Sequence, residues 1–337
     1  MRQTSWNKDN RVFLHKVLPL DTPFSLVIGA SSTCNFKCKY CIHALSNDRL
    51  KDINFILKIM SNELFTKIIH DVNTFPNKIK SLQFSKDGEP LMNKKLPEMI
   101  HDAKRSDKFE RVELITNGTL LTPEINLKLI DAGLDTMRIS LQGISAEGYH
   151  KITGIHIDFE NFLETITHFY RNKKNCKLHL KMIDIGIDGD KDIDTFHDIF
   201  DDMCDEISIQ YTIPYFNDYI NYDTIQKDST INLFGNKNET VHVCPRPFMS
   251  ISVSTDGSVM PCCRENIQDL VLGDAKHESI FDLWNSEKMR MLRILHLKKK
   301  RHEHVICKNC CIPDKITYDS DNLDKHSNNL SKYYEHR

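Results

Sequence analysis

The sequence has no long apolar run and almost no net charge. None of its apolar runs reaches the roughly 20 residues that a membrane-spanning helix requires, and its first residues are polar, unlike those of a signal peptide. The formal net charge is −2 over 337 residues, so no basic field attracts nucleic acid. We therefore expect a cytoplasmic protein with neither a nucleic-acid nor a membrane partner.

The remaining composition is typical of a globular protein, with 40% hydrophobic and 27% charged residues. A chain of 337 residues can form one large domain and a smaller one. Its 11 cysteines come without a secretory signal, which argues against a disulfide-bonded scaffold. In a reducing compartment, cysteines that lie in groups predict metal ligands instead.

Three of these cysteines, Cys34, Cys38 and Cys41, follow the pattern C-x3-C-x2-C. Three thiolates so close in sequence can hold three corners of a cubane iron–sulfur cluster, and no nearby fourth cysteine completes the set. An iron without a protein ligand can bind a small molecule and pass an electron to it, which is a catalytic arrangement. The alternatives are unrelated free cysteines or part of a zinc site.

Strand-like and helix-like patterns alternate through most of the chain. The predicted strands are residues 25–30, 79–85, 112–116, 136–141, 178–185 and 206–213. The predicted helices between them are residues 62–73, 96–105, 123–132, 159–171 and 193–203. Six such units imply a parallel sheet with helices outside. An eight-unit barrel needs about 250 residues, so we predict an α/β fold with a partial (β/α)6 barrel.

The same patterns divide the chain into five parts. Residues 249–254 and 258–260 flank a Thr-Asp-Gly turn and predict a β-hairpin, and residues 279–297 predict an amphipathic helix. The last 23 residues are polar without periodicity. We predict an N-terminal arm (1–24), the barrel (25–214), a linker (215–243), a small hairpin-plus-helix domain (244–314) and a disordered tail (315–337).

The first cysteine group also contains an aromatic residue, Tyr40, directly before Cys41, and it follows the first predicted strand. With this C-x3-C-x-Φ-C pattern the chain resembles the radical S-adenosylmethionine (SAM) superfamily. The resemblance implies that Cys34, Cys38 and Cys41 hold a [4Fe–4S] cluster whose open iron is chelated by SAM. It further implies reductive cleavage of SAM to a 5′-deoxyadenosyl radical, which abstracts hydrogen from a substrate.

Three later strand ends match the same family in order. Asp87-Gly88-Glu89-Pro90 resembles the "GGE" segment, although a carboxylate at position 87 replaces a small residue and could itself touch the ligand. Thr116-Asn117-Gly118 ends the third strand and Ser140 lies near the end of the fourth, where ordinary turn chemistry is the alternative for Asn117 and Ser140. The implied SAM contacts are Tyr40, Gly88, Glu89, Asn117 and Ser140. Plausible substrate contacts, equally well explained as ordinary residues, are Asp184, Asp188, Gln210 and Tyr211.

A second cysteine group lies near the end of the chain, at Cys244, Cys262, Cys307 and Cys310. Four thiolates from a hairpin and a knuckle can surround one metal centre, and zinc ribbons use the same geometry, so spacing leaves the metal open. Cys263 and Cys311 each adjoin one of these residues and could replace that neighbour.

The residues around this second group resemble a SPASM or "twitch" auxiliary-cluster domain. The resemblance rests on Cys244-Pro245, the Asp256-Gly257 turn, Pro261-Cys262-Cys263, the helix with Leu283-Trp284 and the final C-x2-C pair. It implies one auxiliary [4Fe–4S] cluster at Cys244, Cys262, Cys307 and Cys310, as in the radical SAM dehydrogenase type that acts on an aminocyclitol. The two resemblances cover residues 24–314.

Together these features predict a radical SAM oxidoreductase with two [4Fe–4S] clusters and SAM. We expect a small polar substrate, such as a sugar, nucleotide-sugar or cyclitol, that loses two electrons with the auxiliary cluster as acceptor. A flavodoxin or ferredoxin-type protein would supply the reducing electron. The sequence does not identify a general base. The alternatives are a peptide- or protein-modifying radical SAM enzyme and a non-enzymatic zinc-binding protein.

Overall fold

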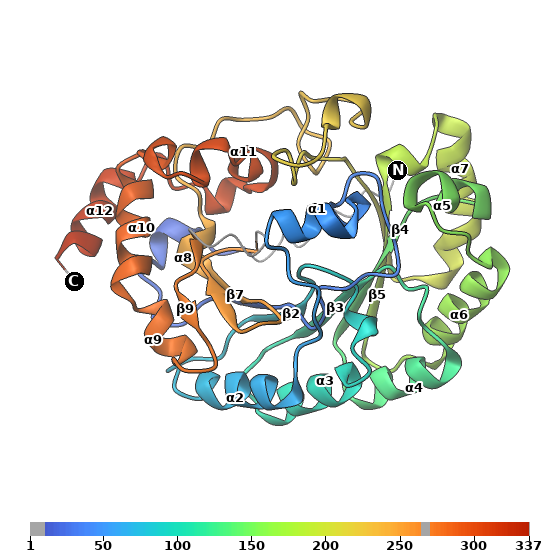
Figure 1. Ribbon diagram of the computed structural model, residues 1–337, viewed down its shortest axis with the longest axis horizontal. Helices are drawn as coiled ribbons and strands as arrows, with labels where there is room; N and C mark the ends of the chain where they lie inside the picture. Colours follow the sequence, from blue (N-terminus) through green and yellow to red (C-terminus); the bar gives the residue numbers. More distant parts are fainter. Residues whose placement is uncertain (1–10, 264–269, 337) are drawn as a thin grey trace.

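A computed structural model of the protein describes residues 11–263 and 270–336. The described strands form one sheet in the order β6-β5-β4-β3-β2-β1-β7-β8-β9, which curves around the centre of the molecule (Figure 1). All neighbouring pairs from β6 to β7 are parallel, and β8 and β9 are antiparallel additions at one edge. The strands are β1 (Ser25–Ile28), β2 (Ser81–Phe84), β3 (Val112–Thr116), β4 (Thr136–Leu141), β5 (Lys177–Ile183), β6 (Glu206–Gln210), β7 (Ser250–Val253), β8 (Ser258–Met260) and β9 (Gly273–Asp274).

Helices cover the outside of the curved sheet and follow its strands in sequence (Figure 1). The five predicted helices all form, with bounds within three residues of those expected. They are α2 (Asn62–Val72), α3 (Leu96–Arg105), α4 (Pro123–Asp131), α6 (Phe159–Asn172) and α7 (Asp190–Phe200). The predicted α/β fold with a partial barrel is therefore confirmed. Two short helices, α1 (Asn47–Asp52) and α5 (Ala146–Thr153), were not predicted because each is too short to display a helical period.

Local capping explains where these helices begin and end. The Thr122 hydroxyl accepts a hydrogen bond from the Ile125 amide at 3.2 Å, and Pro123 occupies the first turn of α4. Gly133 follows this helix with a φ of +84°, the left-handed conformation that glycine adopts without strain. The Ser61 and Asp158 side chains cap α2 and α6 in the same way. Capping residues thus position the helix that follows each strand end.

The two faces of the sheet differ sharply in chemistry. Residues that point outward, such as Leu114, Ile139 and Leu180, are fully buried against the helices. Residues at the alternate positions point to the inner face, and several of these are polar and partly exposed, such as Ser140 and Lys181. The inner face of the partial barrel therefore carries polar side chains that solvent partly reaches.

The C-terminal region continues the barrel sheet. β7 pairs in parallel with β1, with Val27 opposite Ser252, and the predicted hairpin then joins β7 to β8. The single helix predicted for residues 279–297 is two helices, α9 (Ile280–Trp284) and α10 (Glu287–Leu297). Ser286 ends the first segment and caps the second by accepting a hydrogen bond from the Met289 amide at 3.3 Å. The second cysteine group is thereby fixed beside the first strand of the barrel.

The prediction of a disordered tail at residues 315–337 is wrong for the part that the structure describes. Helices α11 (Ile312–Ile316) and α12 (Ser327–Glu335) form there, and α12 packs against α10 (Figure 1). Leu330 and Tyr334 are only 4% exposed in a cluster with Phe248. Leu330 and Tyr334 have the i, i+4 spacing of one helix face, but two positions are too few to establish a helical period, so packing against α10 reveals their role.

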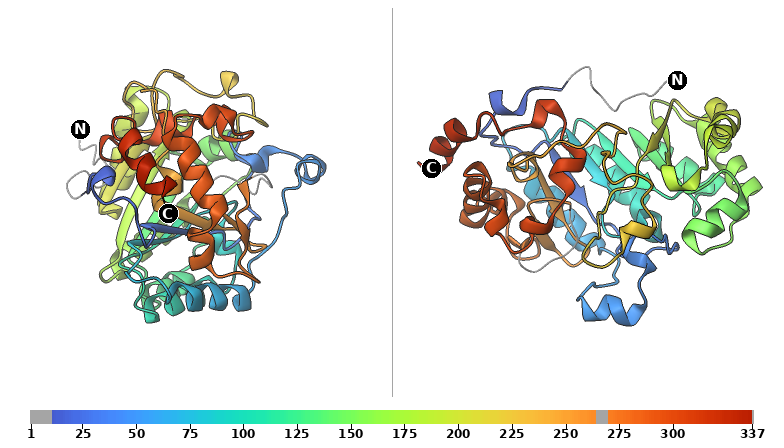
Figure 2. Two further views of the ribbon diagram at one scale, coloured as in Figure 1. Left: turned by 90° about the vertical axis from the view of Figure 1, so that its left-hand side faces the viewer. Right: turned by 90° about the horizontal axis from the view of Figure 1, so that it is seen from above.

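The predicted linker, residues 215–243, crosses the molecule between α7 and α11 (Figures 1 and 2). It has little regular structure, yet hydrogen bonds connect it to several other segments. The Tyr222 hydroxyl donates to the Tyr40 carbonyl oxygen at 2.5 Å, and the Leu233 amide donates to the Lys315 carbonyl oxygen at 3.0 Å. The Tyr215 hydroxyl donates to the Cys263 carbonyl oxygen at 2.8 Å. We call this segment the cover segment.

Candidate active site

The first cysteine group lies in the loop that follows β1, and its thiols are close enough to affect one another's pKa. The pKa of Cys38 is raised well above its usual range by burial and by the nearby Cys41 and Cys34 thiols. Burial also raises the pKa of Cys34 to about 11. Buried thiols that repel one another as thiolates suit a metal centre, which replaces their protons with positive charge.

This cluster loop is held over the ends of β3 and β4. The Lys37 amide donates to the Thr153 carbonyl oxygen at 3.0 Å, at the end of α5. The Asn117 side-chain amide donates to Asn35 Oδ1 at 2.8 Å. Asn117, a predicted SAM contact, therefore uses its side-chain amide to anchor the cluster loop.

Tyr40 anchors the same loop from the other side. Its hydroxyl donates to Gln142 Oε1 at 2.7 Å, just beyond the end of β4. Burial and the neighbouring Cys38 raise the pKa of Tyr40 well above its usual range, so the hydroxyl stays protonated and remains a donor. The aromatic residue of the cysteine motif thus ties the loop across the barrel mouth.

The turn at residues 87–89 touches the cluster loop directly. A Cβ atom on Gly88 would lie 2.4 Å from the Thr33 carbonyl oxygen, so only glycine permits this approach. The buried Glu89 carboxylate accepts hydrogen bonds from the Asn117 amide at 2.7 Å and from Thr116 Oγ1 at 2.6 Å. Burial raises the pKa of Glu89 in spite of these bonds. Glu89 therefore joins the turn after β2 to the end of β3.

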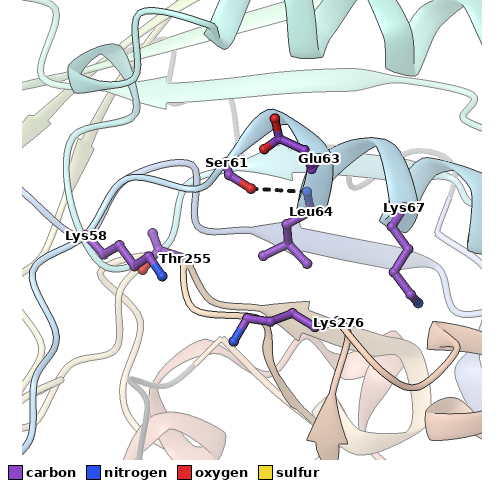
Figure 3. Close-up of a pocket in the computed structure, with 7 residues that line it drawn as sticks. All are labelled: Lys58, Ser61, Glu63, Leu64, Lys67, Thr255 and Lys276. Atoms are coloured by element: carbon purple, nitrogen blue, oxygen red, sulfur yellow. Dashed lines mark hydrogen bonds between the residues drawn. The ribbon is translucent and has the colours of Figure 1, made fainter.

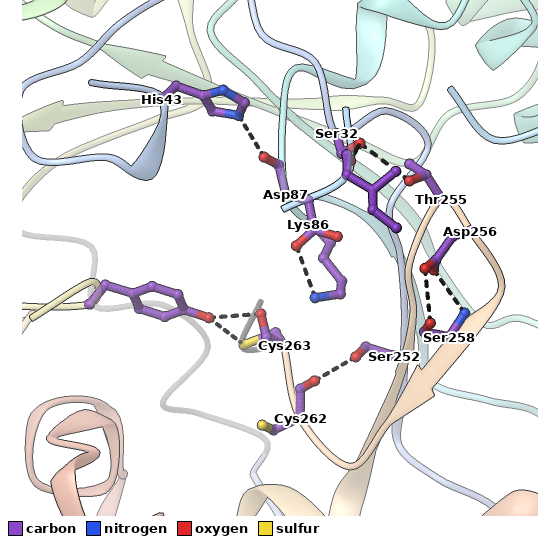
Figure 4. Close-up of polar contacts among 12 residues, drawn as sticks. Ser32, His43, Lys86, Asp87, Ser252, Thr255, Asp256, Ser258, Cys262 and Cys263 are labelled. Carbon is purple, nitrogen blue, oxygen red and sulfur yellow. Dashed lines mark hydrogen bonds and ion pairs between the residues drawn. The ribbon is translucent and has the colours of Figure 1, made fainter. Parts of the chain in front are cut away.

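Asp87 forms a buried ion pair with its neighbour, Lys86, with 2.9 Å between Lys86 Nζ and Asp87 Oδ1. Its backbone has a φ of +69°, and its carbonyl oxygen lies 2.7 Å from His43 Nε2. Burial lowers the pKa of His43, which favours a neutral ring that donates from Nε2 to this carbonyl. Figure 4 shows Asp87 and Lys86 between His43 and the segment that carries Cys262 and Cys263. Sequence reasoning missed His43, whose only signal is its position two residues after Cys41.

Ser140, the last predicted SAM contact, lies on the inner face of β4 and is partly exposed. The four possible substrate contacts divide differently. The buried Asp184 carboxylate accepts from the Thr212 amide at 2.8 Å, which is a structural bond, and Asp188 is an exposed partner of Lys227. Gln210 lies on the inner face, at the end of β6. The Tyr211 ring packs instead against Gly235 of the cover segment.

The second cysteine group also converges. The pKa of Cys244 is raised well above its usual range by burial, by Cys310 and then by Cys262 and Cys307. These four thiols come from three separate segments, namely the start of α8 (Arg246–Met249), the end of β8 and the 3-10 helix Cys307–Asn309. Arg301 Nη1 donates to the carbonyl oxygens of Cys307 and Cys310, at 3.1 and 2.8 Å, and orders the knuckle.

Cys263 bonds to the first residue of the cover segment, and Cys311 bonds to the residue just before that segment. The Tyr215 hydroxyl lies 3.4 Å from Cys263 Sγ, and the Cys311 thiol donates to the Pro214 carbonyl oxygen at 3.3 Å. Among the described residues, no group of three or more His, Cys, Asp or Glu side chains is arranged around a single metal ion. The thiolates of a cubane each bind a different iron, so their sulfur atoms do not have to surround a single metal ion.

A pocket of about 300 Å³ borders the cluster loop, between α2 and the β7–β8 turn (Figure 3). Lys58, Lys67, Lys276 and Glu63 are its charged lining residues. Lys67 is paired with Asp71 at 2.7 Å and Lys276 with Asp274 at 3.4 Å. The hydroxyl oxygen of Thr255, which lines this pocket, lies 3.3 Å from that of Ser32, and Ser32 precedes Cys34 by two residues.

Among the residues that the structure describes, no helix has the length and hydrophobicity of a membrane-spanning segment.

Comparison with known proteins identifies the family. The model of the radical SAM superfamily matches residues 29–203, more than half of the chain. The protein belongs to the radical SAM superfamily. A second model, the SPASM iron–sulfur cluster-binding domain, matches residues 244–311. Membership confirms the predicted resemblance, and the two matches support an enzyme that uses SAM and iron–sulfur clusters.

Individual relatives are more distant. A probable GTP 3′,8-cyclase of Methanococcus aeolicus is 33% identical over 139 residues, which cover 40% of this chain and 42% of that relative. BtrN in complex with AdoMet and 2-DOIA has a TM-score of 0.54 and 17% identity, covering 88% of this chain and 97% of BtrN. SuiB of Streptococcus suis bound to S-adenosylmethionine has a TM-score of 0.60 and 16% identity. The match covers 93% of this chain and 76% of the SuiB chain. At these identities the two structures demonstrate a shared fold.

Proposed function

We propose that this radical SAM enzyme oxidises a small polar substrate of the sugar, nucleotide-sugar or cyclitol type by two electrons. The observation that carries the proposal is the row of polar, partly exposed side chains on the inner face of the sheet. Inner-face positions such as Ser140 and Gln210 suit hydroxyl-rich molecules, because each polar side chain can exchange hydrogen bonds with them. BtrN, a neighbour in fold, is an aminocyclitol radical SAM enzyme, which agrees with this substrate class.

In this proposal the two cysteine groups hold two [4Fe–4S] clusters. Cys34, Cys38 and Cys41 hold the cluster that binds SAM, and Cys244, Cys262, Cys307 and Cys310 hold the auxiliary cluster. When bound, these groups supply reductive cleavage of SAM, the radical that removes a substrate hydrogen, and an acceptor for the second electron. The buried, mutually repelling thiols at both places support this assignment.

The protein itself orients the reactants and keeps water out. His43 donates to the Asp87 carbonyl oxygen, and Gly88 lets the same turn approach the cluster loop. Both contacts support the proposal that this turn binds the SAM ammonium. The cover segment reaches Tyr40 on one side and Cys263 on the other. A segment bound at both cysteine groups limits access to the interior, which protects a reactive radical from solvent.

The cover segment also favours a small substrate over a peptide. A peptide must enter as an extended chain, and this segment occupies the side between α7 and α11 with contacts at both ends (Figure 2). Likeness to the peptide-bound SuiB structure concerns the fold, so it does not alter this preference.

We further propose that a flavodoxin or ferredoxin-type protein delivers the reducing electron near the basic pocket at Lys58 and Lys276. These donors are acidic, and a basic surface beside the cluster loop steers them to the correct place.

The proposal is tested by anaerobic reconstitution of the full chain. A brown protein with about eight irons and eight sulfides should release 5′-deoxyadenosine from SAM when dithionite is added. A Cys34→Ala/Cys38→Ala/Cys41→Ala variant should keep about half the iron and lose all SAM cleavage. A colourless zinc protein, or cleavage by the triple variant, would contradict the proposal.

A further inference from the structure

The inner face of the barrel has a lower layer in which charged groups are paired. The buried Glu113 carboxylate of β3 lies 2.6 Å from Arg138 of β4 and accepts a hydrogen bond from Ser81 Oγ at 2.9 Å. His179 of β5 bonds to Ser208 of β6, with 2.8 Å between Nε2 and Oγ. This layer closes the bottom of the interior with internal bonds.

Lys181 lies one layer above, nearer the strand ends where the cysteine loop begins. Its neighbours along β5, Leu180 and Met182, are fully buried on the outer face, so Lys181 points inward. It stands opposite Ser140 on β4 and Ser208 on β6, and it is partly exposed to the interior. Within the part of the chain that the structure describes, no carboxylate pairs with its ammonium group.

The charge on Lys181 is therefore uncompensated by any carboxylate of the described residues, 11–263 and 270–336. Burial, and then the like charge of Arg138, lower the pKa of Lys181 to about 8, and the ammonium form still dominates at neutral pH. A largely buried ammonium without a partner is costly, and an anion that enters the interior removes that cost. The paired groups of the lower layer do not supply one, because Arg138 already engages Glu113.

We propose that Lys181 binds an anionic group of the substrate, a phosphate or a carboxylate, within the barrel interior. This inference rests on the proposed function, which makes the interior the substrate chamber. SAM is a poor candidate for the anion, because its ammonium and sulfonium outweigh its carboxylate and its net charge is +1. Ser140 and Ser208 stand beside Lys181 on the neighbouring strands. Ser208 is engaged by His179, so Ser140 is the neutral hydroxyl donor beside the lysine. The substrate class narrows to acidic or phosphorylated polyols and sugars, including nucleotide-sugars.

Calorimetric titration of the reconstituted full-length enzyme with inorganic phosphate and pyrophosphate tests this site. Lys181→Met keeps an unbranched side chain one atom shorter than that of lysine and removes the charge, and should weaken pyrophosphate binding about tenfold or more. Lys181→Arg should stay within about threefold of the wild type. Lys177→Met removes an exposed lysine from the same strand and should change nothing.

Two further measurements separate this proposal from the proposed function. Lys181→Met should bind SAM as the wild type does and should release 5′-deoxyadenosine under dithionite, because the lysine contacts the substrate alone. Pyrophosphate binding that is equal in wild type and Lys181→Met overturns the anion site and leaves SAM cleavage intact. Weaker binding of SAM, but unchanged binding of 5′-methylthioadenosine, would assign Lys181 to the SAM carboxylate and overturn the substrate assignment. Absence of SAM cleavage by the wild type overturns the proposed function instead.

Discussion

At the scale of single residues, the predicted SAM contacts have different tasks. Glu89 and Asn117 form hydrogen bonds with other groups of the protein. These bonds join the loops after β2 and β3 to each other and to the cluster loop. Ser140 alone among the polar predicted contacts lies on the accessible inner face. A motif residue can therefore be essential for the site because it shapes the loop that surrounds a ligand.

The neighbouring cysteines Cys262 and Cys263 provide a residue-scale prediction. The Cys262 thiol contributes to the raised pKa of Cys244, whereas the Cys263 thiol contacts the Tyr215 hydroxyl. We expect Cys262→Ser to lose about four of eight irons and Cys263→Ser to keep them. Iron and sulfide analysis of the two reconstituted variants measures this. Equal iron loss in both, or loss in Cys263→Ser alone, would reassign the auxiliary-cluster ligand.

His179 provides a pH-dependent prediction. Burial, then the charges of Arg138 and Lys181, lower its pKa to about 3 in the folded protein. The unfolded chain takes up this proton near pH 6.5, so stability is full above that pH and falls as pH drops toward 3. At pH 5 the loss is about 2 kcal/mol, or roughly 3 °C in Tm. We expect His179→Asn to flatten the dependence of Tm on pH between 7.5 and 5.

The matched control is His70→Asn, which replaces an exposed histidine. It should leave the pH dependence of Tm as in the wild type. If Tm of His179→Asn depends on pH as steeply as Tm of the wild type, a group other than His179 takes up the proton that destabilises the fold.

At the scale of elements, strand ends and turns determine whether the site can assemble. The turn at Asp87-Gly88-Glu89 must approach the cluster loop closely, and the loop must cross to the end of β4 through Tyr40. Each contact joins two segments that follow different strands. The parallel arrangement makes this feasible, because it brings all carboxyl ends to one edge.

Gly88→Ala tests this close approach. The new Cβ would lie 2.4 Å from the Thr33 carbonyl oxygen and 2.8 Å from that of Ser31, so the turn must move away. We expect SAM cleavage to fall about tenfold or more, because small displacements in a reactive site cost large factors in rate. Gly189→Ala is the control, since its Cβ meets no atom within 4 Å and only its φ of +83° is strained. Similar activity in both variants would contradict the packing argument.

At the scale of the whole molecule, the C-terminal third completes the barrel. β7 extends the barrel sheet beside β1, the cover segment spans both cysteine groups, and α12 packs on α10. The two cysteine groups are thus parts of one folded unit. In the proposed function, this shared sheet fixes the relative position of the two centres between which an electron passes.

Leu330→Ala tests whether the tail contributes to that unit. Leu330 is 4% exposed and belongs to the cluster around Phe248, so its truncation should cost about 3 kcal/mol. Tyr333→Ala on the same helix removes a side chain that is 62% exposed and should change stability by less than about 0.5 kcal/mol. Thermal unfolding of both variants measures the difference. Equal Tm values would mean that α12 is dispensable.

Much of the fold was predictable because it depends on local order. The alternation of apolar residues determines strands and helices, and capping residues such as Thr122 determine where helices begin. The cysteine spacing at Cys34, Cys38 and Cys41 indicated the family, because few kinds of site place three cysteines on one short loop. Such features involve residues that are neighbours along the chain.

Tertiary structure decided everything that joins distant segments. Only the folded chain pairs His43 with Asp87, separates Cys262 from Cys263, places β7 beside β1 and buries Leu330. It also leaves Lys181 without a counter-ion among the described residues, which no sequence pattern could reveal. The physical reason is that burial and charge compensation depend on which side chains meet in space, and these are separated by tens to hundreds of residues.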